Sequence, residues 1–285
     1  MSRIVWLASY PKSGNTWLRA FLANFENDGS APANINNLAL GGISSSRPLA
    51  DDALGIECAD LTHEEIDLYR PAFYRSMAAR SAHTLLVKTH DAYTINSEGE
   101  PLFPSDVTKG VLYLIRNPLD VAVSFAYHRA EAFDETIARM GRESSAFADR
   151  PDRLHIQLRQ RLLSWSGHVL SWLDQRALRL HVMRYEDMCL HPIKTFMGAV
   201  RFLGMDENPD RVRRAVDFSS FEKLRCQEQK FGFKESPHGT AAFFRNGRAA
   251  AWRDALTNSQ AERVMSDHGE VMGRFGYLSR AGAAQ

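Results

Sequence analysis

The sequence predicts an α/β fold in which a mostly parallel central sheet is flanked by helices on both faces. Short apolar segments of strand length alternate with segments that have helical periodicity, which is typical of such sheets. At 285 residues, with 44% hydrophobic residues, the chain is long enough to form a well-buried core. Because no change of composition marks a boundary, we expect a single domain over residues 1–285.

The first strand is expected at residues 4–8, where a compact β-prone apolar run stands near the N-terminus. A tight turn over residues 10–15 follows, and Trp17, Phe21 and Phe25 then recur at helical spacing. This order predicts a strand, a turn and a helix.

A second strand and helix are predicted around residues 111–115, which are apolar and β-prone. Asn117 is a good N-cap and Pro118 suits the first helical turn, so a helix should begin there. Residues 85–87 and 180–183 supply two further short apolar strands.

The longest helical pattern is expected between residues 154 and 172, where apolar side chains recur every three or four positions. Residues 26–60, 130–152 and 226–244 show little periodicity and are interpreted as surface loops. The apolar side chains of that helical pattern are Leu154, Leu158, Leu162, Trp165, Val169 and Trp172.

Charge and cysteine content limit the classes of function. The net charge is +1, from 35 basic and 34 acidic residues, so neither a nucleic acid nor a membrane is expected as a partner. Cys58, Cys189 and Cys226 form no CxxC pair, which favours a reducing, cytoplasmic setting without disulfides or a zinc site. The N-terminal apolar run is too short for a signal peptide or a membrane span.

The turn after the first strand has the composition of an anion site. Lys12 carries a positive charge, Gly14 lets the backbone approach a ligand, and the N–H groups of Asn15 and Thr16 open a helix. The Walker A pattern GxxxxGK[ST] is absent because the lysine precedes the glycine. Taken alone, the turn could equally lead into a helix without binding any ligand.

Residues 10–17, YPKSGNTW, resemble the loop of cytosolic-type sulfotransferases that holds the 5′-phosphosulfate of 3′-phosphoadenosine 5′-phosphosulfate (PAPS). The match departs at Asn15. Arg116 and Ser124 resemble the pair that holds the 3′-phosphate in that family, and bidentate guanidinium binding suits a phosphate monoester. The resemblance implies the three-layer sandwich of P-loop nucleotide kinases, with PAPS as co-substrate and the bisphosphate PAP as product.

Three further segments extend the resemblance over roughly residues 3–262. Tyr185 opens a YEDM segment whose tyrosine contacts adenine in the family, and Phe221 closes a segment whose aromatic residue stacks on the base. Residues 245–247 resemble the loop that closes over the 3′-phosphate, but Asn246 replaces a lysine and residues 250–251 replace a Gly-Asp pair. The nucleotide contacts implied by the resemblance are those of Lys12, Ser13, Gly14, Asn15, Thr16, Trp17, Arg116, Ser124, Tyr185, Ser219, Phe221, Arg245, Asn246 and Gly247.

The resemblance also implies the catalytic residues. His90 closes the strand in which the family carries its histidine general base, and imidazole titrates in the range such a base needs. Lys12 would face the bridging oxygen of the donor, and Lys88 would be a second cation near the sulfuryl group. No metal is required for this chemistry. Considered alone, a histidine at a strand end more often only satisfies a loop hydrogen bond; beside the other matching segments, the general base is the favoured interpretation of His90.

Two other functions stay open. A nucleotide kinase or other P-loop phosphotransferase could use the acidic residues after Tyr185 to bind magnesium, although the order of lysine and glycine is wrong for one. A non-catalytic nucleotide-binding module could have kept the fold and lost the chemistry.

The acceptor is expected to be a small-molecule or natural-product hydroxyl. Its pocket could be lined by Phe133, Phe147, Phe231 and Phe233. A homodimer is possible, because residues 253–262 loosely match the family's dimer motif at Arg253, Thr257 and Glu262.

Overall fold

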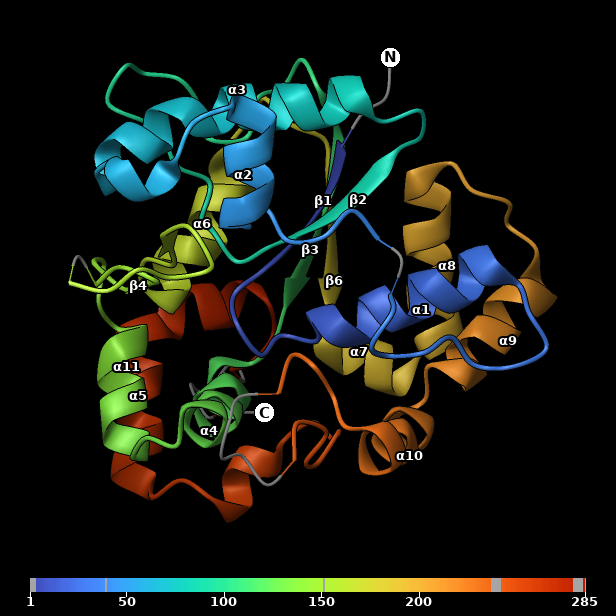
Figure 1. Ribbon diagram of the computed structural model, residues 1–285. Coiled ribbons are helices and arrows are strands. Elements are labelled where there is room, and N and C mark those ends of the chain that lie inside the picture. The colour runs from blue at the N-terminus through green and yellow to red at the C-terminus, as the bar shows by residue number, and fades with distance from the viewer. Residues whose placement is uncertain (1–3, 39, 151, 237–241, 279–283, 285) are drawn as a thin grey trace. The chain divides into compact units, whose positions relative to one another are not determined.

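The computed structural model describes residues 4–38, 40–150, 152–236, 242–278 and 284 (Figure 1). The chain forms two compact units, each of which is described by itself. The first unit comprises Met1–Tyr10, Gly41–Tyr113 and Arg142–Val182. The second unit comprises Pro11–Leu40, Leu114–Gly141 and Met183–Gln285.

The strands of the central sheet lie in the order β2-β1-β3-β6 (Figure 1). β1 pairs with β2 in parallel, with Ile4 opposite Leu85 and Ala8 opposite Thr89. The predicted mostly parallel sheet flanked by helices is confirmed. The strands are β1 (Ile4–Ser9), β2 (Leu85–Thr89), β3 (Thr108–Ile115) and β6 (Leu180–Arg184).

The core of the first unit is aromatic. The Trp6 ring of β1 meets Tyr74 at 4.8 Å and Phe103 at 4.9 Å between centroids, and all three side chains are fully buried. Edge-to-face pairs of this kind add to the stabilisation from burial alone. The helices and short strands of this unit are α2 (Arg47–Leu54), η1 (Cys58–Asp60), α3 (His63–Arg80), β4 (Ala146–Phe147), β5 (Gln160–Arg161) and α6 (Trp165–Asp174).

The prediction of one helix between residues 154 and 172 is wrong in its first half. Leu154 is 68% exposed, and the short strand β5 pairs antiparallel with β4 instead of continuing a helix. The helix α6 begins only at Trp165, because the hydroxyl of Ser164 accepts from the N–H of Gly167 and caps it there. Apolar spacing alone could not separate buried extended chain from helix in this segment.

The second unit is largely helical. The predicted helix start at Asn117 and Pro118 is confirmed: the Asn117 side chain accepts from the N–H of Leu119 at 3.0 Å. Helix α1 begins at Asn15, directly after the predicted turn. The helices are α1 (Asn15–Asn27), α4 (Pro118–Arg129), α5 (Phe133–Met140), α7 (Tyr185–Leu190), α8 (Pro192–Leu203), α9 (Pro209–Phe218), α10 (Phe221–Phe231), η2 (Ala251–Asp254) and α11 (Asn258–Arg274).

The three segments expected to be loops contain regular structure. Residues 26–60 include α2, residues 130–152 include α5 and β4, and residues 226–244 begin inside α10. Each element is short, so its few apolar residues give little periodic signal. Residues 39, 151 and 237–241 of these segments lie outside the described residues. In the part of the chain that the structure describes, no helix has the length and apolar character to cross a membrane.

Candidate functional site

The loop between β1 and α1 has an unusual backbone. Lys12 has φ +67° and Gly14 has φ +101°, both in the left-handed region. That conformation costs energy for a residue with a Cβ, and such strain in Lys12 is typical of functional loops. The Gly14 carbonyl accepts from the N–H groups of Trp17 and Leu18, so the N-terminus of α1 starts at this point. The loop therefore presents helix N–H groups and a lysine beside one another.

Among the buried polar atoms that have no hydrogen-bond partner in the described residues are Oγ of Ser13, in this loop, and Nε1 of Trp17, in the first turn of α1. Buried polar atoms are nearly always satisfied in proteins, so these two are available to a polar ligand at this loop. Asn15 and Thr16 are buried beside them, at the start of α1.

Arg116, at the end of β3, brings several predicted segments of the second unit together. Its Nη1 donates to the carbonyl of Lys12 and its Nη2 to the carbonyl of Arg248, each at 3.3 Å. The guanidinium lies 4.1 Å from the ring centroid of Tyr185. Its Nε is buried and has no partner among the described residues. Arg116 is 9% exposed as a residue, and its guanidinium is held by two carbonyls while its Nε can still donate to an anion.

Tyr185 is fixed by the residues next to it. Glu186 accepts from the Asn117 N–H at 2.9 Å and from the Tyr277 hydroxyl at 3.0 Å. Burial raises the pKa of Glu186, and the hydrogen bond from Asn117 opposes that rise. Burial also raises the pKa of the Tyr185 phenol, so the ring stays neutral. Sequence reasoning missed Glu186 and Tyr277 as supports of the site, although Glu186 stands inside the YEDM segment.

The 244–252 segment is attached to α4 by a residue that sequence reasoning also missed. The carboxylate of Asp120 accepts from the N–H groups of Ala250 at 2.8 Å and Trp252 at 3.0 Å. The segment also lies against α10, because the ring of Phe221 occupies the space that a Cβ on Gly247 would need. Asp120 precedes Ser124 by four residues on the same helix, a spacing that puts both on one face.

The aromatic residues expected to hold a base share one cluster in the second unit. Trp17 and Phe221 both pack against a buried group of residues, and the Trp17 ring lies 5.9 Å from that of Tyr185. Ser219, two residues before Phe221 in the chain, is buried, and its hydroxyl donates to the Ala215 carbonyl at 2.8 Å. The buried group consists of Ala20, Ile35, Leu224, Phe233 and Phe244.

The side chains of Lys12 and Arg245 both lie over aromatic rings. The Lys12 ammonium is 4.0 Å from the Phe243 ring centroid and donates to Nδ1 of His128 at 3.4 Å. The exposed Arg245 side chain lies 4.0 Å over the ring of Tyr127. His128 was not predicted, although it follows Ser124 by one helical turn. Ser124 itself is half-buried in α4, and Asn246 is half-buried between Arg245 and Gly247.

His90 and Lys88 belong to the first unit, at the end of β2. Nδ1 of His90 lies 2.8 Å from the carbonyl oxygen of Ser9. Because a carbonyl can only accept, Nδ1 carries the proton, and the lone pair of the neutral ring is on Nε2. Lys88 is opposite Leu7 of β1 and is half-buried. This arrangement leaves Nε2 of His90 as the basic atom of the ring.

Among the residues that the structure describes, no group of three or more His, Cys, Asp and Glu side chains is arranged to hold a metal ion. Positive charge around the loop between β1 and α1 comes from Lys12, Arg116 and the start of α1.

These features define a class of protein. A strand, a strained loop and a helix N-terminus follow one another at Lys12 and Gly14, and Arg116 stands directly after the strand β3. The chain is therefore an α/β protein with a P-loop-like fold.

Comparison with known proteins identifies the family. The sequence model of the sulfotransferase domain matches residues 2–276, so the chain belongs to the sulfotransferase family and is a transferase. It is 26% identical to sulfotransferase 2A6 of Rattus norvegicus over 94% of this chain and 84% of that protein. It is also 26% identical to flavonol 3-sulfotransferase of Flaveria bidentis, over 96% of this chain and 83% of that protein. The structure of mouse sulfotransferase SULT7A1 complexed with PAP superimposes on this chain with a TM-score of 0.61 at 21% identity. The superposition covers 98% of this chain and 87% of that one.

Proposed function

We propose that this chain is a PAPS-dependent sulfotransferase that acts on a hydroxyl of a small-molecule or natural-product acceptor. The observation that carries the proposal is the contact between Nη1 of Arg116 and the carbonyl of Lys12 at 3.3 Å. It brings the guanidinium of Arg116 to the backbone of the loop that carries Lys12, and both lie within the second unit. In this proposal the loop and the arginine form two anion cradles, one for each phosphate-bearing end of a doubly phosphorylated adenosine.

The first cradle suits the 5′ end of the donor. The amides at the start of α1, with Asn15 and Thr16, would bind its phosphate, and the Oγ of Ser13 would gain the partner it lacks. Gly14 leaves room for this approach because it carries no Cβ. Lys12 would stabilise the charge that develops on the departing oxygen.

The second cradle suits the 3′-phosphate. Arg116 would donate from its buried Nε, and Ser124 would donate from α4 about two turns along the helix. Arg245, Asn246 and Gly247 would close over it, with one cation fewer than the family pattern. Charge-assisted hydrogen bonds from a guanidinium are among the strongest that a phosphate receives.

The adenine would be held by aromatic side chains. Trp17 and Phe221 pack against one cluster and would flank the base, while Tyr185 and Ser219 would contact its edge. The Nε1 of Trp17, buried without a partner among the described residues, fits a polar group of the nucleotide. The fit of these residues to PAPS supports the proposal.

The proposed chemistry is an in-line transfer. Bound PAPS supplies an activated sulfuryl group. Nε2 of His90 takes the proton of the acceptor hydroxyl as that oxygen forms its bond to sulfur and the bond from sulfur to the bridging oxygen breaks. Lys12 stabilises the leaving phosphate, and Lys88 the sulfuryl oxygens. A general base of this kind contributes about 10²–10⁴-fold to the rate.

The acceptor is proposed to be a small molecule, in line with a relative named for its action on a flavonol. Of the four phenylalanines considered for its pocket, Phe233 belongs to the buried cluster and serves packing. Phe231 is 60% exposed, Phe133 begins α5, and Phe147 lies in β4. These three keep the proposed role.

The remaining proposals concern the whole protein. We propose that both units belong to one sulfotransferase domain over residues 1–285, since the family match runs through both. We also propose a cytoplasmic location, with no nucleic acid or membrane as a partner. A homodimer through residues 253–262 stays a possibility to be tested by light scattering.

Calorimetry with PAP, beside a turnover assay with PAPS and a panel of phenols and alcohols, tests the proposed function. We expect PAP binding and magnesium-independent transfer, with no ATP hydrolysis. His90→Ala should keep the fold and PAP binding while turnover is lost. Lys12→Ala should keep the fold and lose turnover. ATP hydrolysis would indicate a kinase, and PAP binding without any turnover a non-catalytic module. A His90→Ala variant that retains its kcat would contradict the base assignment.

A further inference from the structure

The backbone that follows His90 is held by one face of α6. The ring Nε2 of His168 lies 3.1 Å from the carbonyl of His90, and the indole N–H of Trp172 donates to the carbonyl of Asp91 at 3.0 Å. The hydroxyl of Ser171 accepts from the backbone N–H of Tyr93 at 3.0 Å. Residues 168, 171 and 172 share a helix face by their spacing. One helix thus holds the backbone of this loop at residues 90, 91 and 93.

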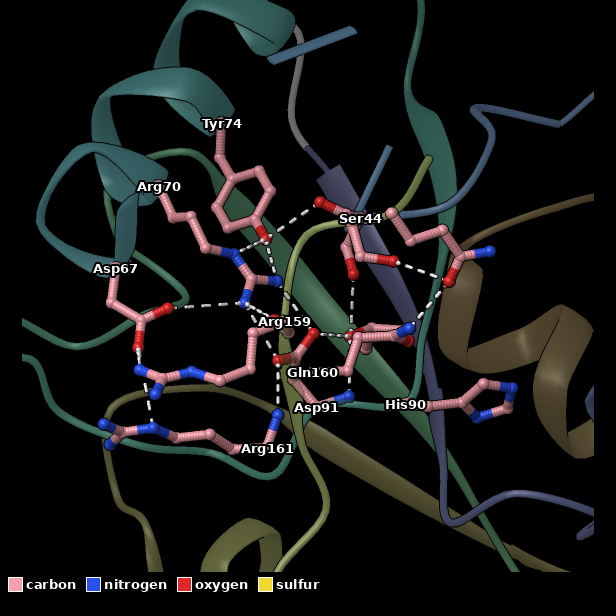
Figure 2. Close-up of polar contacts among 12 residues, drawn as sticks. Ser44, Asp67, Arg70, Tyr74, His90, Asp91, Arg159, Gln160 and Arg161 are labelled. Carbon is pink, nitrogen blue, oxygen red and sulfur yellow. Dashed lines mark hydrogen bonds and ion pairs between the residues drawn. The ribbon is translucent and has the colours of Figure 1, made fainter. Parts of the chain in front are cut away.

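The side chain of Asp91 is fixed more firmly still. Both of its oxygens accept from the guanidinium of Arg70 on α3, at 2.9 and 2.7 Å (Figure 2). The Arg70 side chain is 1% exposed and that of Asp91 is 0% exposed. Asp91 also accepts from the N–H of Arg161 in β5 at 3.2 Å. The residue next to His90 is therefore held by a buried bidentate ion pair.

The network around this pair reaches the end of β2 from a second side. The Tyr74 hydroxyl accepts from Arg70 and donates to the carbonyl of Ser44 at 3.2 Å, as Figure 2 shows. The hydroxyl of Ser44 donates to that of Thr89 at 2.9 Å, immediately before His90. Both neighbours of His90 are thus anchored, and the hydrogen bond from its Nδ1 to Ser9 sets the ring.

Stability alone does not account for such a pair. Two charges that leave water incur a desolvation penalty that their attraction barely offsets, and apolar residues of similar size often stabilise a core as well or better. What the pair provides in addition is fixed geometry, because a bidentate guanidinium and carboxylate meet in one orientation. That geometry is imposed on the residue adjacent to the proposed base.

We propose that Arg70 and Asp91 are positioning residues that fix the backbone and ring of His90, so that Nε2 faces the acceptor hydroxyl in the proposed reaction. The inference rests on the proposed function only for the identity of the base. The anchoring of His90 has its own test, independent of turnover.

The test replaces the pair with a neutral one, Arg70→Met with Asp91→Asn, in the full-length protein. Asparagine keeps the acceptor for the Arg161 N–H and removes the buried charge. If the pair only stabilises the core, the variant keeps its kcat. If it positions His90, we expect kcat to fall by about 10–100-fold, while the Kd for PAP changes by less than about twofold. The matched control, Arg80→Met with Asp52→Asn, removes an exposed pair of the same unit and should change neither value.

Nitrogen-15 NMR of the histidine rings provides the independent signature. The wild type should show His90 with its proton on Nδ1, and the double variant should show a mixture of tautomers. If the double variant does not fold, Arg70→Lys gives the same readouts, because it keeps the opposite charge beside Asp91 and loses the bidentate geometry. Unchanged kcat together with an unchanged His90 spectrum would overturn the proposal. If His90→Ala itself keeps full kcat, the base assignment fails instead, and the spectrum alone then decides whether Asp91 positions the ring.

Discussion

The ring of Tyr185 occupies the space that a Cβ on Gly14 would need, with Cδ2 only 2.8 Å from that position. The loop between β1 and α1 therefore touches Tyr185, the proposed contact of the adenine, within the second unit. A change at one should disturb the other.

Gly14→Ala tests this contact. The new Cβ would collide with the Tyr185 ring, and alanine at φ +101° is strained. We expect a stability loss of about 2–3 kcal/mol and a loss of PAP affinity of at least about tenfold. Chemical denaturation and calorimetry measure the two. Gly204→Ala is the control, since Gly204 has φ +69° with nothing within 4 Å of its Cβ position. It should lose stability and keep PAP affinity; equal effects of both variants on PAP would contradict the prediction.

Arg116→Lys should weaken PAP binding although it keeps the charge. A lysine cannot donate at once to the carbonyls of Lys12 and Arg248 and to a phosphate in the planar arrangement of a guanidinium. We expect PAP affinity to fall about 10–100-fold, as measured by calorimetry. The exposed Arg201, which pairs with Glu207, gives the matched Arg→Lys control and should leave affinity unchanged. Wild-type affinity in Arg116→Lys would rule out the proposed role of the guanidinium.

Ala250→Gly should stabilise the protein slightly. Ala250 has φ +60°, a conformation that costs alanine about 1–2 kcal/mol and glycine almost nothing. Glycine also stabilises the unfolded chain by about 0.4–1 kcal/mol, because its backbone has more conformational entropy there. The net increase in the free energy of unfolding is therefore expected to be below about 1 kcal/mol. Urea denaturation measures it. The neighbouring Ala249→Gly, without a positive φ to relieve, should destabilise, and a shift of the same sign in both variants would refute this explanation.

Stability should fall in acid because of His168. Burial lowers its pKa from 6.5 to about 3, with only partial opposition from the hydrogen bond to His90. In the unfolded chain His168 takes up a proton as the pH falls below 6.5, while the buried ring of the folded protein stays neutral down to about pH 3. The free energy of unfolding therefore decreases as the pH falls between these two values. Between about pH 7 and pH 5 the loss is about 2 kcal/mol. Urea denaturation of His168→Gln at both pH values should show a weaker pH dependence than the wild type, with exposed His83→Gln as the control. An identical pH slope in His168→Gln would contradict the assignment.

Local sequence determined the elements whose signals lie within a few residues. The strand, turn and helix over residues 4–27 follow from an apolar run, a glycine and helical spacing. The helix start at Asn117 follows from a cap and a proline, because capping is a contact between neighbours in the chain. Most residues expected to bind the nucleotide could be named for the same reason: they stand in short contiguous segments.

Only the tertiary structure decided the contacts between distant residues. Arg70 meets Asp91, Tyr277 meets Glu186, and Asp120 holds the N–H of Ala250 across 130 positions of sequence. No local pattern identifies such partners, because a buried charge or backbone group is satisfied by whichever group the packing brings near. For the same reason residues 154–164 form no helix despite their helical spacing: burial of Leu158 and Leu162 depends on the surrounding core, which spacing alone does not encode.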